Sequence, residues 1–156
     1  MLSDILTVQT SASIFYSYAR ETHVGELLKR EDARITVFAP TNKAVIALPR
    51  KPHQGPAPVD DGIVISEEEF DARSRENVER WISAHIVPQT ITSLSPSSKH
   101  ETLLEGITVT VSAKSDAADS DKPDWQQVVL NDKISVVGKH EAANGVLYLV
   151  DGAFYG

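Results

Sequence analysis

Histidine, serine and aspartate are the side chains in this sequence that could carry hydrolytic chemistry. A hydrolase needs a serine nucleophile, a histidine base and an acidic residue that orients the histidine. The chain has five histidines, but it has no Gly-x-Ser-x-Gly elbow, no HExxH zinc motif and no glycine-rich phosphate or dinucleotide loop. We therefore predict no catalytic residues, no enzymatic activity and no cofactor. The histidines are His23, His53, His85, His100 and His140.

His85 has the most informative position of the five. With Val78, Trp81 and Ile82 it follows the spacing i, i+3, i+4, i+7, which predicts one buried face of a helix. Such a histidine could bind a ligand or sense pH, because its ring titrates near neutrality. The alternative, which we favour, is a buried ring whose nitrogens bond to backbone groups or to a hydroxyl such as that of Thr41.

An acidic run is a second candidate site, because its carboxylates could bind Ca²⁺. It lacks the glycine and the terminal glutamate of an EF-hand loop. Clustered charge among small residues favours a solvated loop over 114–124, and we predict no metal site. The sequence has no cysteine, which also excludes disulfides and thiolate ligands. The run consists of Asp116, Asp119, Asp121 and Asp124.

Trp125 follows the acidic loop and precedes a predicted strand. An exposed tryptophan could anchor a binding partner. At the start of a strand, however, tryptophan is more often a partly buried cap on the core. Both possibilities stay open at the level of sequence.

The composition predicts a single globular domain over residues 1–156. Hydrophobic residues make up 41% and charged residues 24%, and the formal net charge is −7. An acidic chain without a basic stripe lacks the main energetic term for binding nucleic acid. The apolar stretches are too short for a transmembrane helix. Met1 is followed by Leu2-Ser3-Asp4, which is not the start of a signal peptide.

Helical spacing dominates the first half of the chain. Ser11 is expected to cap a helix over 14–19, and the same pattern continues over 24–28. Ser66, with a glutamate three residues later, forms a predicted capping box. The helix that it opens is expected to run to about residue 83, where the buried face containing Trp81 ends.

A strand and a short helix are predicted between these helices. Segment 35–39 is rich in β-branched residues, and Pro40 is expected to end the strand because proline cannot donate to a ladder. Thr41 or Asn42 can then cap a helix over 43–48.

Residues 49–62 are rich in proline and glycine, which predicts a loop. The segment is too short to link two domains with a full core on each side. We interpret it as a surface insertion whose removal should leave the fold intact, because solvated loops close at small cost.

Strands are predicted in the last third of the chain. Segments 102–104 and 107–111 should form a hairpin, and Asn131-Asp132 should mark a later connection. Asn144-Gly145 is a strong signal for a type I′ turn, which needs positive φ at both central residues. Helices early and strands late favour an α+β fold. The later strands are expected over 127–130, 134–137 and 146–150, the last one buried on both faces.

Three strings of residues resemble motifs of the fasciclin family. Thr36 to Val45 (TVFAPTNKAV) and Asn144 to Asp151 (NGVLYLVD) resemble its two signatures, and Ala84 to Pro88 (AHIVP) is similar to its central segment. Their order and spacing also match, and the resemblance covers nearly the whole chain. The signature positions are Thr36, Val37, Phe38, Ala39, Pro40, Thr41, Asn42, His85, Asn144, Gly145 and Asp151.

This sequence departs from the family pattern at two motif positions. Ala84 stands where the family has a tyrosine before its histidine, so the receptor binding associated with that pair is not carried over. Tyr148 replaces the histidine of the second signature. The long proline-rich insertion is similar to insertions in some fungal members.

The resemblance implies a wedge-shaped β-sandwich with helices packed around one edge. It also implies a non-enzymatic protein- or glycan-binding module of cell adhesion or extracellular matrix. Such a module would be secreted, at the cell surface or in the secretory pathway or vacuole, and a monomer or weak oligomer. Weak candidates for partner contacts are His85, Ile86, Val87 and Trp125.

Two other functions remain as alternatives. The first is a small-molecule or lipid carrier that uses a crevice between the helices and the sheet. A carrier of this kind should show a largely apolar pocket of about 300–1,000 Å³. The second and weaker alternative is a hydrolase without a recognisable motif.

Overall fold

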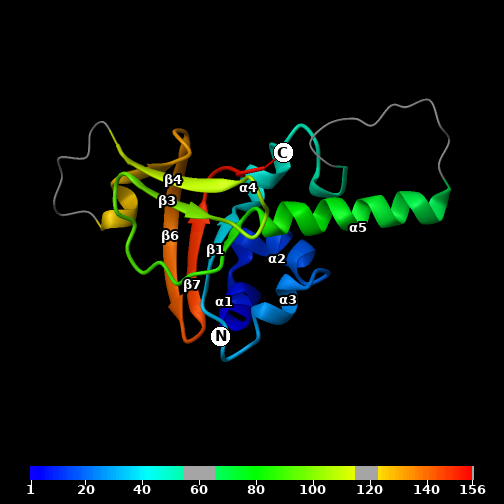
Figure 1. Cartoon of the computed structure of the whole chain (residues 1–156), viewed down its shortest axis with the longest axis horizontal. Helices are drawn as coiled ribbons and strands as arrows, with labels where there is room; N and C mark the ends of the chain where they lie inside the picture. Colours follow the sequence, from blue (N-terminus) through cyan, green and yellow to red (C-terminus); the bar gives the residue numbers. More distant parts are fainter. Residues whose placement is uncertain (55–65, 115–122, 156) are drawn as a thin grey trace.

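The structure is a computed structural model, and it describes residues 1–54, 66–114 and 123–155 (Figure 1). The helices are α1 (Leu2–Val8), α2 (Ser13–Ala19), α3 (Val24–Leu27), α4 (Asn42–Ile46) and α5 (Glu67–Ser83), with 3-10 turns η1 (Thr10–Ala12), η2 (Pro52–Gln54) and η3 (Asp124–Gln126). The strands are β1 (Ile35–Pro40), β2 (Ile86–Val87), β3 (Ser98–Glu101), β4 (Thr108–Ala113), β5 (Val128–Leu130), β6 (Ile134–Ala142) and β7 (Gly145–Val150). None of the described helices is long and apolar enough to cross a bilayer.

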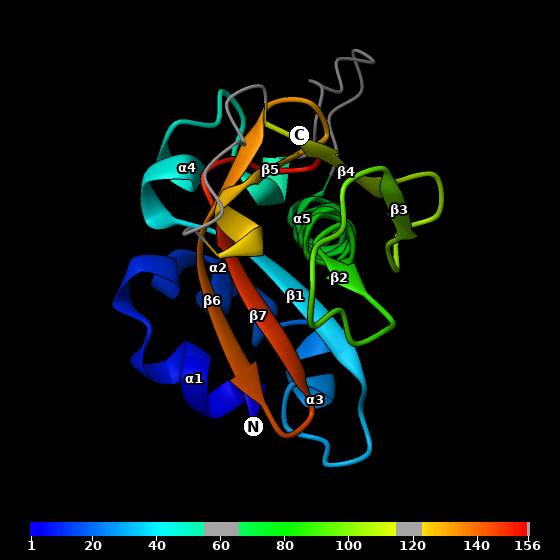
Figure 2. The ribbon, with the colours of Figure 1, turned by 90° about the vertical axis from the view of Figure 1, so that its left-hand side faces the viewer.

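The strands form one seven-stranded sheet in the order β2-β1-β7-β6-β5-β4-β3. Strands β1 and β7 pair in parallel, and the other neighbouring pairs in this order are antiparallel. In Figure 2, β7 lies between β6 and β1, and α1 lies beside these strands. The predicted α+β class and the β-sandwich with helices packed against it are confirmed.

Successive side chains of the two central strands, β1 and β7, belong to two different clusters of the core. Val37 on β1 and Leu147 on β7 belong to a cluster with side chains of all five helices. Their neighbours Phe38 and Tyr148 belong to a second cluster with side chains of β2, β4, β5 and β6. Every residue of β7 is buried, so the predicted burial of this strand on both faces is confirmed.

Two predicted element boundaries were wrong. Ser11 lies within η1, and α2 begins at Ser13 without a side-chain cap on its N-cap residue. Segment 102–104 is not extended but belongs to the connection between β3 and β4, and the strand that pairs with β4 is β3. The hydroxyl of Thr102 donates to the carbonyls of Leu104 and Ile107, and Gly106 has a φ of 90°. These local bonds and the positive φ hold the segment out of an extended ladder.

The type I′ turn is at a different connection from the one predicted. Ala142 pairs with Gly145, so Ala143 and Asn144 are the turn residues, and neither is among the residues with positive φ. Asn131 and Asp132 have φ values of 50° and 66° at the β5–β6 connection. That turn has the positive angles that a type I′ turn requires.

The beginning of the proline-rich segment is not a free surface loop. Pro52 is buried, and the side-chain amide of Asn77 on α5 donates to the carbonyl of His53 at 3.0 Å. The start of the predicted surface insertion therefore contacts α5, although Pro49 and Gln54 are exposed. Residues 55–62 lie outside the described part of the chain.

Candidate functional site

The first signature string builds the junction between β1 and α4. Thr41 caps α4 by accepting a hydrogen bond from the Ala44 N–H at 3.3 Å, as predicted. Asn42 acts on a different helix: its side-chain oxygen accepts from the Ile14 N–H at 2.9 Å, and its amide donates to the Thr10 carbonyl at 3.0 Å. Asn42 therefore supplies the cap at the start of α2 that Ser11 was expected to provide.

The other residues of this string lie in the core. Val37, Phe38 and Ala39 have no exposed surface, and the ring of Phe38 stacks on Tyr148 with 5.4 Å between centroids. Pro40 remains inside β1 as its last residue, rather than just beyond it. These side chains contribute packing, and none of them is accessible to a partner.

His85 is fully buried where α5 passes into β2. Its Nδ1 donates to the Trp81 carbonyl at 2.6 Å, and its Nε2 accepts from the Phe154 N–H at 3.1 Å. Burial lowers the pKa of His85 from 6.5 to about 4, although the bond to Trp81 acts to raise it. The structure thus shows a buried ring bonded to backbone groups, with Phe154 in the place expected for the Thr41 hydroxyl. The adjacent candidates Ile86 and Val87 are buried as well.

The second signature string fixes the β6–β7 hairpin to the helical layer. The side-chain oxygen of Asn144 accepts from the Leu2 N–H at 2.8 Å, and its amide donates to the carbonyls of Leu28 and Arg30 at 2.9 and 3.1 Å. A Cβ on Gly145 would lie 2.0 Å from the Ile35 carbonyl oxygen. Gly145 is therefore required by close backbone packing and not by a positive φ.

Asp151 closes the same string at the end of β7. Its carboxylate accepts from the Ser135 N–H at 2.8 Å, and its own N–H donates to the Ser135 carbonyl at 3.0 Å. The residue thus extends the β6–β7 pairing past the last strand residue.

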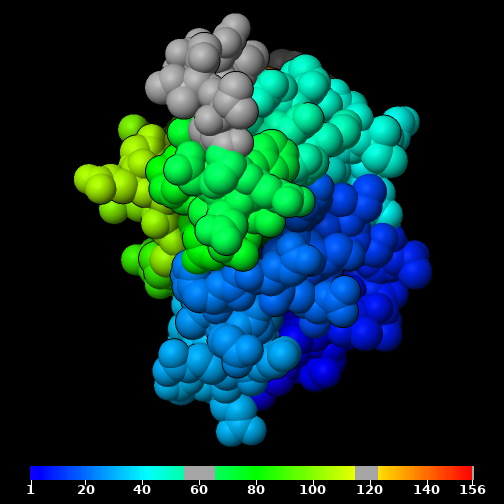
Figure 3. All heavy atoms as spheres, turned by 90° about the vertical axis from the view of Figure 1, so that its right-hand side faces the viewer, coloured from blue at the N-terminus to red at the C-terminus, as the bar shows by residue number. Residues whose placement is uncertain are grey.

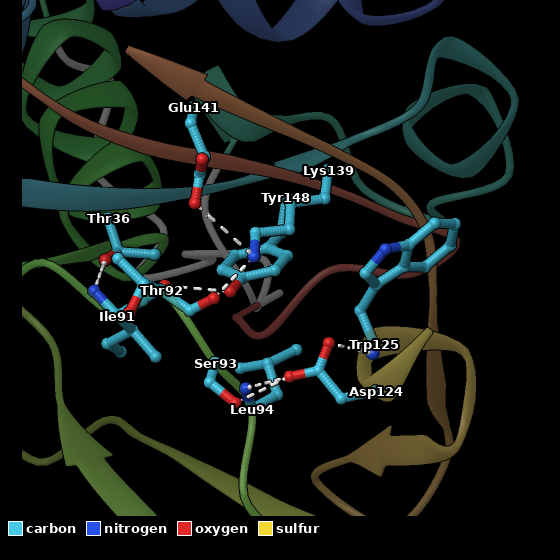
Figure 4. A network of polar contacts seen from close by, with 10 residues as sticks. All are labelled: Thr36, Ile91, Thr92, Ser93, Leu94, Asp124, Trp125, Lys139, Glu141 and Tyr148. Carbon is cyan, nitrogen blue, oxygen red and sulfur yellow. Dashed lines mark hydrogen bonds and ion pairs between the residues drawn. The ribbon is translucent and has the colours of Figure 1, made fainter. Parts of the chain in front are cut away.

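A polar network that the sequence analysis missed fastens the segment between β2 and β3 across the sheet (Figure 4). The Thr36 hydroxyl accepts from the Ile91 N–H at 2.8 Å and donates to the Gln89 carbonyl at 2.7 Å. The Tyr148 hydroxyl donates to the Ile91 carbonyl at 2.8 Å, and Lys139 donates to the Thr92 carbonyl. The partners are 47 to 57 residues apart in sequence, and no local pattern marks them.

Asp124 belongs to this network and not to a solvated acidic loop. Its carboxylate accepts from the Ser93 hydroxyl at 2.7 Å and from the N–H groups of Leu94 and Trp125 at 3.1 and 2.9 Å. Burial acts to raise the pKa of Asp124, but these hydrogen bonds outweigh it and the pKa is lowered. Trp125 is half-buried and packs against the second core cluster, as a partly buried cap would. Asp116, Asp119 and Asp121 lie outside the described residues.

A groove of about 260 Å³ lies between η2 and α5. Figure 3 shows the face on which α5, in green, lies next to the segment that leads into η2, in cyan. The groove contains hydrogen-bond donors, two arginines and one large apolar side chain, and none of the described residues that line it is a carboxylate. The lining residues are Arg50, His53, Gln54, Phe70, Arg73, Ser74 and Asn77.

The family can be decided by comparison with known sequences. The sequence profile of the Fasciclin domain matches residues 10–155. The chain belongs to the fasciclin domain family. Fasciclin domains are generally adhesion-type modules without enzymatic activity, and they are typically extracellular or in the secretory pathway.

Fungal relatives of this fasciclin domain carry the same description. A FAS1 domain-containing protein of Aspergillus fumigatus is 34% identical over 92 residues, which cover 56% of this chain and 39% of the relative. One of Saccharomyces cerevisiae is 34% identical over 128 residues, covering 74% of this chain and 44% of the relative. The matches thus span less than half the length of these curated relatives.

A solved structure shows the same fold. It is the FAS1 domain pair from the insect cell adhesion molecule Fasciclin I, with a TM-score of 0.64 and 14% sequence identity. The match covers 99% of this chain and 50% of that chain. At this level of identity the likeness concerns the fold alone.

Proposed function

We propose that this fasciclin domain is a non-enzymatic module of cell-adhesion or extracellular-matrix type that binds a protein or glycan partner. The observation that supports the proposal most is the structural use of the signature residues. Their polar atoms bond to backbone groups and their apolar side chains fill the core. The signature residues thus stabilise the fold, and we expect other residues on the surface to bind the partner.

The packing of the helices on the sheet favours a binding module over a carrier. A carrier needs a crevice at that interface, but the first core cluster fills it with fully buried side chains. Phe15 and Trp81, for example, lie 5.7 Å apart between ring centroids. A partner would therefore be bound on the outside of the domain.

We also propose a place of action outside the cytoplasm. Adhesion-type modules work at the cell surface, in secreted form or in the secretory pathway or vacuole, and the family is typically found there. In that setting we expect this domain to act as a monomer or weak oligomer.

A binding measurement with fractionated material from the source organism tests the proposal. The purified protein should bind saturably to the isolated cell-wall or matrix fraction and not to the cytoplasmic fraction. Heat-unfolded protein serves as the control for non-specific adsorption. Equal retention by both fractions, or retention of unfolded protein alone, would rule the proposal out.

A further inference from the structure

The groove between η2 and α5 has a preformed wall on the η2 side. The Arg50 guanidinium donates to the Gln54 carbonyl at 2.7 Å, and the Gln54 side-chain oxygen accepts from the Lys51 N–H at 2.8 Å. The Gln54 N–H donates to the Lys51 carbonyl at 2.9 Å, and Pro52 between them is buried. A wall held by its own hydrogen bonds loses little entropy when a ligand binds to it.

Side-chain amides line the junction of this wall with α5. The Asn77 amide nitrogen donates to the His53 carbonyl, and the Gln54 side-chain oxygen is used within η2. The remaining half of each amide, the Asn77 oxygen and the Gln54 nitrogen, has no hydrogen-bond partner among the residues described. The two amides therefore add one acceptor oxygen and one donor NH2 group to the Ser74 hydroxyl.

The α5 side of the groove is a single helix face with one cation and one aromatic ring. Phe70, Arg73, Ser74 and Asn77 follow the spacing i, i+3, i+4, i+7. Phe70 is 56% exposed. In the described part of the chain Arg73 forms no ion pair, whereas Arg80 farther along α5 pairs with Glu76 at 2.6 Å.

We propose that this groove binds a uronic acid residue of an acidic saccharide. The Arg73 guanidinium would pair with the sugar carboxylate, a geometry in which arginine makes two parallel hydrogen bonds. Phe70 would cover the apolar C–H face of the ring, and the two amides and Ser74 would bind its hydroxyls, which both donate and accept. A groove of about 260 Å³ suits one ring rather than a larger ligand. The inference deepens the proposed binding function and rests on it.

The net charge of the chain limits how this recognition works. With a formal charge of −7, the domain as a whole repels an anionic glycan. Attraction must come from the groove at short range, so binding should weaken as salt screens the Arg73 charge.

Calorimetric titration of the whole protein with a hyaluronan tetrasaccharide, built from glucuronate and N-acetylglucosamine, tests the proposal. Tetra-N-acetyl chitotetraose, a neutral oligomer called chitotetraose below, should bind much more weakly. Arg73→Gln should weaken hyaluronan binding about tenfold or more, because it removes a charged hydrogen-bond pair. Phe70→Ala should also weaken it. Arg75→Gln makes the same charge change on α5 outside the groove and should leave the affinity unchanged.

Other outcomes would overturn the assignment. Equal losses of hyaluronan affinity in the Arg73 and Arg75 variants would show that only the net charge matters. Equal affinity for chitotetraose and hyaluronan would show that the sugar carboxylate is not recognised. Binding of a tetraglutamate peptide in place of the saccharide would assign the groove to an acidic protein partner. If the wild-type protein binds none of the three ligands but still binds the isolated cell-wall or matrix fraction, the saccharide inference fails and the proposed function stands. If neither binding occurs, both fail.

Discussion

Asn144 shows how a single signature residue can serve the fold. Its side chain bonds to backbone groups at positions 2, 28 and 30, so it joins the last hairpin to the first helices. The sequence analysis correctly predicts that Asn144 and Gly145 matter for the hairpin, but the reason it gives, a type I′ turn, is wrong. The turn preference is a local property, whereas the bonds that occupy Asn144 reach more than a hundred residues along the chain.

Gly145→Ala tests the close approach at this pair. The new Cβ would meet the Ile35 carbonyl oxygen at 2.0 Å, so we expect a loss of about 2–3 kcal/mol in the free energy of unfolding. Gly138→Ala is the matched control, because its Cβ meets only a methyl carbon of Leu149 at 3.1 Å, which can move. Denaturant unfolding of both variants gives the comparison, and equal effects would contradict the close-packing explanation.

His85 gives the fold a dependence on pH. Its pKa is about 4 in the folded state and near 6.5 when unfolded, so the unfolded state binds more protons between these values. The contribution of neutral His85 to the free energy of unfolding is therefore fully present above pH 6.5. It is lost as the pH drops toward 4, by about 3 kcal/mol in all. Melting temperatures measured from pH 7 to pH 4 should show this decline.

A pair of histidine variants separates this effect from that of other titrating groups. His85→Phe should lower stability at neutral pH, because it removes two hydrogen bonds, but it should flatten the decline below pH 6.5. His140→Gln changes an exposed histidine and should leave the decline unchanged. A decline that persists in full in the His85 variant would show that other groups cause it, such as carboxylates or His100, whose pKa burial also lowers.

Among the secondary-structure elements, periodic segments could be predicted and long-range pairings could not. The buried face of α5 and its Ser66 cap follow from local spacing, and both are present in the structure. The sequence predicts a strand over 102–104 because Leu103 and Leu104 look extended in isolation, but this segment lies in the connection between β3 and β4. Only the pairing of β3 with β4 shows which residues form the ladder, and that partner choice is not encoded locally.

The segment between β2 and β3 provides a prediction at the scale of elements. Thr36→Val keeps the shape of the side chain in β1 but removes the bonds to the Ile91 N–H and the Gln89 carbonyl. We expect a loss of about 1–3 kcal/mol in stability and faster amide exchange at 91–94. Thr110→Val on β4, where the backbone N–H bonds to Asn131, is the control and should leave exchange at 91–94 unchanged. Unaltered exchange in the Thr36 variant would mean that these bonds do not fasten the segment.

For the molecule as a whole, the signature strings lie apart from the groove to which we assign binding. The signature residues lie in the β1–α4 junction, the α5–β2 junction and the β6–β7 hairpin (Figure 1). The groove lies between η2 and residues 70–77 of α5. The sequence pointed to the family through the first group and gave no sign of the groove. The groove arises because η2 docks on α5 through the Asn77 to His53 bond, a contact that spacing along the chain does not encode.

The affinity of the Thr36→Val variant for the isolated cell-wall or matrix fraction tests the central claim most directly. If the signature strings shape the backbone and the surface binds the partner, the folded variant should bind with an unchanged Kd well below its unfolding temperature. Loss of binding by a variant that keeps its near-UV circular dichroism would contradict the claim, because it would place the signature itself in the contact with the partner.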